Sequence, residues 1–303
     1  MYTYTLGHII RKHGIRYHIY ADDTQMYVSF DPRVPGDDER ALSRLSKCID
    51  DVKCWMTSNK LQLNEQKTEF FLTSTSYKLS NLPELKLKIG DAEIAASPTV
   101  KNLGVTFDTT MSMSKHVSDM CRSINFHLRN MFRIRRYIDF DCCNHLARSL
   151  ITSRLDYANA LLYGVKSRDL KRLQSLQNRA ARLVFRVPRD QNAEVLLSDL
   201  HWLPVNDRIL FKNMLYVYKC LNHEAPPYLS DCLCKRVPGR EGMRSGHDST
   251  RLYEPRINLV TAGDRSFQAF APREWNKLPI TLRESISVSS FKGKLKTHLF
   301  PRF

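Results

Sequence analysis

The spacing of apolar residues divides the chain into two parts. Before residue 113, several short runs alternate apolar and polar residues, which is typical of half-buried β-strands. Beyond Ser114, apolar residues return every three or four positions, which is typical of one face of a helix. The pattern therefore predicts an α+β fold in which a mixed first part is followed by helices.

The first part is expected to contain a hairpin, a helix and a small antiparallel sheet. The hairpin strands are predicted at residues 15–20 and 25–30, and an apolar stripe from Leu42 to Met56 predicts a helix packed on the sheet. Further strands are expected at residues 70–73, 85–89, 92–95 and 100–107, the last one interrupted by Gly104.

The second part is expected to be helical, with a less regular end. Helices are predicted at about residues 117–134, 141–155, 168–185 and 206–221, and a last amphipathic helix near residues 291–299. Residues 236–249 are polar and contain three glycines, so a loop is predicted there. The predicted domains are residues 1–113, 114–189 and 190–303.

Positive charge is concentrated in the helical part. The formal net charge is +16, yet residues 1–113 hold 14 Lys and Arg against 14 Asp and Glu. Residues 114–189 alone hold 16 basic and 5 acidic residues. Such a block predicts a face that binds a polyanion, with nucleic acid favoured over an acidic membrane because no separate basic amphipathic anchor is present. The alternative is that these cations only solubilise the helices, although solubilising surfaces usually mix both signs.

The sequence gives no sign of a membrane or a secreted environment. It has no signal-peptide core and no apolar run of membrane-spanning length, so an intracellular location, cytoplasmic or nuclear, is expected without a membrane partner. Its eight cysteines are expected to be reduced. Cys220, His223, Cys232 and Cys234 have the identities of zinc ligands, but their C-x2-H-x8-C-x-C spacing is not that of a standard finger. Free, partly buried cysteines are predicted, and a zinc site is the alternative.

Two adjacent carboxylates, Asp22 and Asp23, fall between the two predicted hairpin strands. Their charges repel unless a cation neutralises them, and hard oxygen ligands suit Mg²⁺, which one or two carboxylates and substrate phosphates typically hold. The alternative is a solvated turn, because Asp favours turns.

The stretch HIYADDTQMYVSF at residues 18–30 resembles the catalytic palm hairpin of the reverse transcriptases of LINE-type (non-LTR) retrotransposons, close to the jockey-like animal elements. Further stretches resemble the same family in the same order, so the resemblance covers nearly the whole chain. These stretches are LQLNEQKTEF at 61–70, VKNLGVTFD at 100–108, SRLDYANALLYG at 153–164, QNRAARLVF at 177–185, LHWLPVNDRILFK at 200–212 and FQAFAPREWNKLP at 267–279.

The resemblance implies an RNA-directed DNA polymerase that uses Mg²⁺ for nucleotidyl transfer to a primer. It implies that Asp22 is the principal metal ligand, Asp23 its partner, and Tyr20 a residue near the primer end. Lys67 matches a lysine proposed to protonate the leaving pyrophosphate, and its alternative role is a surface cation in a turn. A positioned cation near departing phosphate is physically sensible in either case.

The resemblance also implies where the nucleic acid lies. Leu103 and Gly104 match a turn that grips the primer backbone, where a missing Cβ allows close approach; the alternative for Gly104 is a β-bulge. The basic helices match a thumb, which would hold an RNA template and DNA primer, or an RNA–DNA duplex, through phosphates and 2′-hydroxyls. The cations expected to make these contacts are Arg129, Arg133, Arg136, Lys171, Arg172, Arg179 and Arg182.

The implied fold is an incomplete reverse-transcriptase palm, then a basic thumb-like bundle and a mostly helical C-terminal region. In the family, the two-metal site also needs an aspartate on an earlier strand and a Gly- and Gln-containing motif. Only residues 1–14 precede the hairpin here, and they contain no carboxylate. We therefore expect a catalytically incomplete member of the family. The alternative is a non-catalytic remnant that binds nucleic acid.

Overall fold

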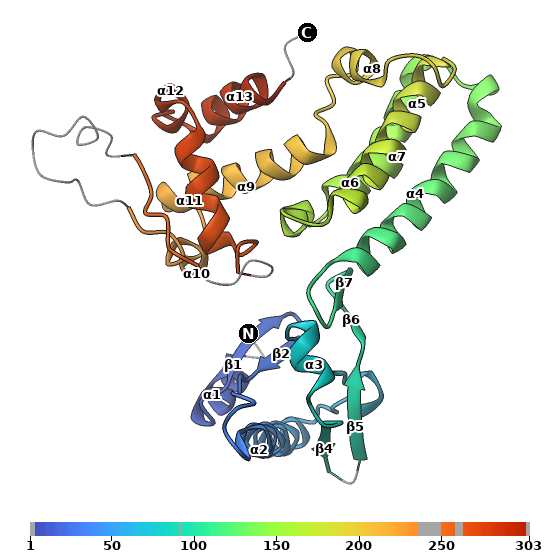
Figure 1. The fold of residues 1–303 in the computed structure, drawn as a ribbon. Coiled ribbons are helices and arrows are strands. Elements are labelled where there is room, and N and C mark those ends of the chain that lie inside the picture. The colour runs from blue at the N-terminus through green and yellow to red at the C-terminus, as the bar shows by residue number, and fades with distance from the viewer. Residues whose placement is uncertain (1–3, 91, 236–249, 258–262, 301–303) are drawn as a thin grey trace, which may run out of the picture. The chain divides into compact units, whose positions relative to one another are not determined.

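The computed structural model describes residues 4–90, 92–235, 250–257 and 263–300. It is an α+β structure that divides into two compact units, one ending at Met111 and the other beginning at Ser112 (Figure 1). The predicted boundary after residue 113 lies beside this division, and the predicted boundary after residue 189 falls inside the second unit.

The first unit combines helices with short strands, as the alternating pattern predicts. Its elements are α1 (Tyr4–Lys12), β1 (Arg16–Tyr20), β2 (Asp23–Tyr27), α2 (Asp37–Ser58), the 3-10 turn η1 (Glu65–Lys67), β3 (Phe70–Phe71), α3 (Ser76–Ser80), β4 (Lys86–Ile89), β5 (Ala92–Ser97), β6 (Thr99–Asn102) and β7 (Val105–Asp108).

The strands pair in three groups, two of which differ from the prediction. Strands β1 and β2 form the expected antiparallel hairpin, but β2 begins two residues before the predicted strand and ends three residues before its predicted end. The three-stranded sheet has the order β3-β5-β4 and is mixed, because β3 runs parallel to β5. The prediction of a single strand at residues 100–107 is wrong, because this segment forms a second antiparallel hairpin, β6–β7. Its two turn residues, Leu103 and Gly104, have φ values of 45° and 81°, which reverse the chain.

Two helices supply most of the core of the first unit. The apolar stripe of α2 buries Leu45, Ile49 and Val52 in one cluster with residues of β4. Helix α1, which no sequence pattern predicted, adds Ile10 to the same cluster. Gly7 allows this, because a Cβ at that position would collide with the ring of Tyr17 in β1. The hairpin is therefore covered by a helix on one side.

The second unit is helical. Its elements are α4 (Ser114–Ile134), the 3-10 turn η2 (Arg135–Tyr137), α5 (Phe140–Ala147), a π-helical turn η3 (Arg148–Thr152), α6 (Ser153–Asp156), η4 (Asn159–Leu162), α7 (Ser167–Phe185), α8 (Ala193–Asp199), α9 (Val205–Leu221), α10 (Pro227–Ser230), α11 (Phe267–Lys277), α12 (Ile280–Arg283) and α13 (Val288–Leu299). The helix predicted at 141–155 is thus interrupted by a π-helical turn, and the loop predicted at 236–249 lies outside the described residues.

Helices α4 and α7 pack side by side and run in the same direction (Figure 1). The direction follows from two hydrogen bonds: the Ser114 hydroxyl donates to Asp169 near the start of both helices, and Arg179 donates to Asn125 further along. The buried faces between these helices include Ile124 of α4, as the periodicity predicts.

A buried arginine closes the far end of this helix pair. Arg135, only 8% exposed, donates from Nε to the carbonyl of Leu183 and from Nη2 to that of Val184, at 2.8 and 2.6 Å. A third hydrogen bond, from Nη1, reaches the carbonyl of Ile138 at 2.8 Å. Because the last carbonyls of a helix have no partner within it, Arg135 caps the C-terminal end of α7.

A cluster of buried hydrophobic residues in the helical unit joins α9, α11 and α13 (Figure 1). Its centre holds Trp275 and Phe291, and the ring of Tyr218 stacks on Phe291 at 4.4 Å. The Trp275 indole donates to the carbonyl of Thr250 at 2.9 Å. Among the described helices, none combines the length and the apolar content needed to cross a bilayer.

Candidate nucleic-acid and metal sites

The acidic pair lies at the tip of the first hairpin. Asp22 is in the two-residue turn, and Asp23 begins β2 opposite Tyr20, the last residue of β1. Both carboxylates are exposed, and Tyr20 is 66% exposed beside them. Ala21 has a φ of 55°, a left-handed conformation that disfavours any residue with a Cβ. The turn therefore presents two carboxylates and an aromatic ring to solvent.

A side-chain hydrogen bond links this hairpin to the second one. Gln25 of β2 donates from Nε2 to Oδ1 of Asn102, the last residue of β6, at 2.7 Å. Asn102 immediately precedes Leu103 and Gly104, the two turn residues assigned to the primer backbone. The structure thus ties together two segments that the resemblance assigned to one site.

Lys67 is placed in the same unit but is not tied to the acidic turn. It ends η1, where its backbone amide donates to the side chain of Asn64, and its ammonium group is exposed. The neighbouring Glu65 is paired with Lys53 of α2. No hydrogen bond or ion pair among the described residues joins Lys67 to Asp22 or Asp23.

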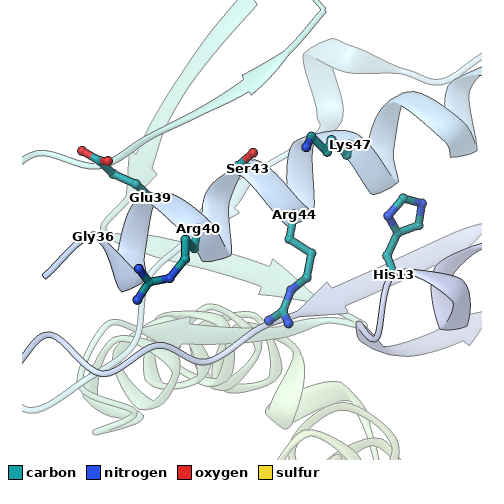
Figure 2. A pocket seen from close by; sticks show the side chains of 7 residues that line it. All are labelled: His13, Gly36, Glu39, Arg40, Ser43, Arg44 and Lys47. Atoms are coloured by element: carbon teal, nitrogen blue, oxygen red, sulfur yellow. The ribbon is translucent and has the colours of Figure 1, made fainter. Parts of the chain in front are cut away.

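A shallow hollow of the first unit lies along α2. Figure 2 shows Arg40 and Arg44 on one side of the helix, and Glu39, Ser43 and Lys47 on the other. The hollow is also lined by Gly36 and by His13, whose ring bonds Asp51 at 2.8 Å. Arg40 is paired with Asp37 at 3.3 Å. Because its cations are exposed and partly matched by carboxylates, this is a weakly basic surface and no enclosed site.

Three of the predicted cations of α7 are arginines that donate hydrogen bonds within the chain. Arg172 donates to Asp169 at 3.1 Å and to Ser118 at 3.2 Å, and Arg179 donates to Asn125 at 2.7 Å. Arg182 donates to the carbonyl of Gln191. Each of these three arginines thus already has an acceptor within the chain, so none of them has its whole guanidinium group available to phosphates.

The cations of α4 and the turn after it are differently placed. Arg129 and Arg133 are exposed, and their side chains make no hydrogen bond or ion pair with another residue of the described chain. Arg136 is exposed in η2 and lies 4.6 Å from the ring centre of Tyr137. These three guanidinium groups are available to phosphate oxygens.

A second hollow lies between α4 and α7. Its basic lining is Arg168, Lys171 and Arg172, and Asn125 and Cys121 line it from α4. Burial raises the pKa of the Cys121 thiol, so this cysteine is protonated at neutral pH. Arg168 escaped the sequence analysis, although its position three residues before Lys171 on the same exposed face could have shown it. The hollow can accept an anion, and its cysteine is not a thiolate.

The cysteines near the end of α9 are all free thiols. Cys220 is buried, and burial raises its pKa, while Cys232 donates to the carbonyl of Tyr228 at 3.3 Å. His223 and Cys234 are exposed. Within the described part of the chain, no three His, Cys, Asp or Glu side chains gather as a metal site would require, at this position or at the acidic turn.

Comparisons with protein-family models, with curated proteins and with solved structures find no match to this chain. The acidic turn offers two exposed carboxylates, and the helical unit offers an exposed basic face on α4 and a basic hollow beside it. The basic surfaces suit a ligand that carries phosphates, and the carboxylates suit such a ligand only when a cation such as Mg²⁺ accompanies it.

Proposed function

We propose that this chain binds an RNA template paired with a DNA primer, as the palm-hairpin and thumb part of a LINE-type reverse transcriptase. The α4–α7 surface grips the duplex through its phosphates. The acidic turn lies beside the primer end, and the turn at Leu103 and Gly104 contacts the primer backbone. The partner is recognised by charge and shape, so binding is indifferent to base sequence.

The observation that carries this proposal is the hydrogen bond between Gln25 and Asn102. This bond couples the acidic turn to the turn that contains Leu103. The resemblance assigns the first turn to the primer end and the second to the primer backbone. Leu103 adds a second argument, because a leucine at a φ of 45° is strained and 41% exposed. Asparagine would fit such a turn better. A strained, exposed apolar side chain suggests a role outside the fold, and contact with a primer strand is such a role.

The carboxylates of the acidic turn fit one Mg²⁺ ion. Asp22 and Asp23 would hold it together with phosphate oxygens of the ligand, which matches the preference of Mg²⁺ for one or two carboxylates. When bound, the ion would neutralise charge on those phosphates. A two-metal polymerase site needs carboxylates that converge from more than one strand. The described residues bring no third carboxylate to this turn, so we assign the chain nucleic-acid binding and not polymerisation on its own.

Charge placement supports the same partner. Residues 120–138 include no Asp or Glu, and this segment holds Arg129, Arg133 and Arg136. With these three guanidinium groups exposed, a phosphate backbone can be neutralised without breaking any protein contact made by Arg129 or Arg133. Each neutralised phosphate releases counterions, which makes the affinity depend on salt.

The proposal is tested by titrating the full chain with a labelled RNA–DNA duplex at several salt concentrations. The variant with Arg129→Gln, Arg133→Gln and Arg136→Gln should bind more weakly and should flatten the slope of log K against log[salt] by roughly two to three units. The matched control removes three exposed cations from elsewhere in the helical unit, as Arg256→Gln, Lys292→Gln and Lys296→Gln. No binding near physiological salt, or equal effects of both triple variants, would show that the charge is only a solvated surface.

A further inference from the structure

The exposed side of α4 and η2 carries aromatic rings as well as arginines. Phe126, Phe132 and Tyr137 are 59%, 74% and 72% exposed. Phe126 meets the neighbouring His127 ring edge-on, at 5.3 Å between centroids, and the guanidinium of Arg136 lies over the ring of Tyr137. Three large exposed rings on one short segment contribute no burial to the fold, and such exposed apolar surface commonly marks a binding site.

The rings and the arginines alternate on the same helix surface. Phe126, Arg129 and Arg133 follow each other at steps of three and four residues, so they lie along one face of α4. Phe132 lies three residues from Arg129 and also points away from the core, since the buried side of α4 is formed by other residues. The face therefore presents flat apolar surfaces between positive charges.

The charge of this face selects the class of ligand. No carboxylate occurs from residue 120 to residue 138, so an acidic polymer is favoured over a protein surface of mixed charge. The rings select further. A duplex keeps its bases stacked on each other, whereas an unpaired strand offers base faces that aromatic side chains can stack on. Arginine side chains next to the rings would hold the phosphates between these bases.

We infer that the face formed by Phe126, Arg129, Phe132, Arg133, Arg136 and Tyr137 binds single-stranded nucleic acid, with unpaired bases stacked on the three rings. This inference rests on the proposed function and adds to it a ligand class, an unpaired strand such as a template before it is copied. The same arginines serve duplex and single strand, and the rings serve only the single strand.

The test uses the full chain and three labelled probes: an oligouridylate strand, an abasic strand of the same length, and the RNA–DNA duplex. Phe132→Ala and Tyr137→Ala should each weaken binding of the oligouridylate by about tenfold, the scale of one lost base–aromatic stack. Binding of the abasic strand and of the duplex should change by less than about twofold, a difference below the energy of one stack. Phe132→Tyr keeps a ring and should retain the affinity for oligouridylate.

A matched control is Tyr253→Ala, which removes an exposed ring of the helical unit far along the sequence from α4. It should leave all three affinities unchanged. If the α4 alanine variants bind oligouridylate as the unaltered chain does, while the triple arginine variant is weakened for the duplex, this inference is wrong and the proposed function stands. Equal losses for the abasic and the base-bearing strand would also overturn it, because stacking would not be involved. Loss of self-association in the alanine variants, with strand binding intact, would assign the face to a second copy of the chain.

Discussion

Arg179 of α7 donates a hydrogen bond of 2.7 Å from Nη1 to Oδ1 of Asn125 in α4. Arg172, seven residues earlier, donates to Ser118 of the same helix, and Arg186, seven residues later, donates to the carbonyls of Arg135 and Ile138. Three arginines at a spacing of two helical turns thus tie α7 to α4 and its continuation. They are part of what holds the helix pair together.

Arg172→Gln should therefore lower the stability of the helical unit. Asp169, which is only 3% exposed, accepts hydrogen bonds from Arg172 and from the Ser114 hydroxyl, and the variant leaves this buried carboxylate with less compensation. We expect a loss of about 2 kcal/mol in the free energy of unfolding, less than for a fully buried pair because Arg172 is partly exposed. Denaturant unfolding measures it. Lys171→Gln, the change of an exposed neighbour, is the control and should stay within about 0.5 kcal/mol.

Arg135→Lys should destabilise the same unit although it keeps the charge. A lysine cannot donate simultaneously to the carbonyls of Leu183, Val184 and Ile138 in the planar geometry of a guanidinium. Leaving buried carbonyls without a donor should cost about 2 to 3 kcal/mol. Thermal unfolding of Arg135→Lys and of Arg136→Lys, its exposed neighbour, would decide the matter, and equal melting temperatures would contradict the capping role.

The chain by itself should not extend a DNA primer on an RNA template with Mg²⁺ or Mn²⁺. The acidic turn supplies Asp22 and Asp23, and no third carboxylate from the described residues converges on them, so repulsion within a two-metal site would be uncompensated. A primer-extension assay tests this. Template-dependent extension that disappears in Asp22→Ala would refute the prediction.

Leu103→Asn should stabilise the β6–β7 turn and weaken primer binding. Asparagine tolerates a positive φ better than leucine does, so the free energy of unfolding should rise by about 0.5 to 1 kcal/mol. Amide exchange across Val100 to Phe107 should slow accordingly, while the affinity for the RNA–DNA duplex should fall because an exposed apolar contact is lost. Gly104→Ala is a control that should have the opposite effect. A Cβ at a φ of 81° strains the turn, so amide exchange should become faster. If Leu103→Asn binds the duplex unchanged, Leu103 has no part in the primer site.

The helical unit should lose stability as the pH falls below about 6.5. Burial lowers the pKa of His116 in α4 from its ordinary value of 6.5, so the unfolded chain takes up a proton at a higher pH than the folded one. Because the unfolded state then binds more protons, stability is complete above the unfolded pKa and falls as the pH drops toward the folded one. Melting temperatures at about pH 7.5 and 5.5 should differ less in His116→Gln than in the unaltered chain. His145→Gln, at an exposed position, should leave the difference unchanged.

Strong periodicity made the long elements predictable. Helices α2, α4, α7 and α9 lie where the pattern of the sequence places them, because each buries a regular apolar stripe. The hairpin at 16–27 gives a weaker pattern, since its apolar residues Tyr17, Ile19 and Met26 are only half-buried. Helix α1 was missed because it is short and contains Gly7, a poor helix former that is present here for its contact with Tyr17. The alternating pattern placed one strand across Leu103, because a leucine at positive φ contradicts local preference, whereas the family resemblance had matched this position to a turn.

The sequence could name the basic residues of the candidate site but could not sort them. Arg129 and Arg179 read alike, as exposed cations on amphipathic helices. They differ because Asn125 lies 54 positions before Arg179 in the chain and beside it in the fold, a relationship that local spacing does not contain. The same is true of Gln25, whose partner Asn102 is fixed only by the packing of two hairpins.

The hydrogen bond between Gln25 and Asn102 also bears on the order of folding. Each hairpin closes over a two-residue turn, which costs little chain entropy and is fast. The bond between them spans 77 positions. Closing so long a loop costs chain entropy, which is offset only when the intervening helix and sheet have formed their contacts. We therefore expect the two turns to form early and the contact between them to form late. A nascent or partly unfolded chain can carry both turns intact and still lack their junction.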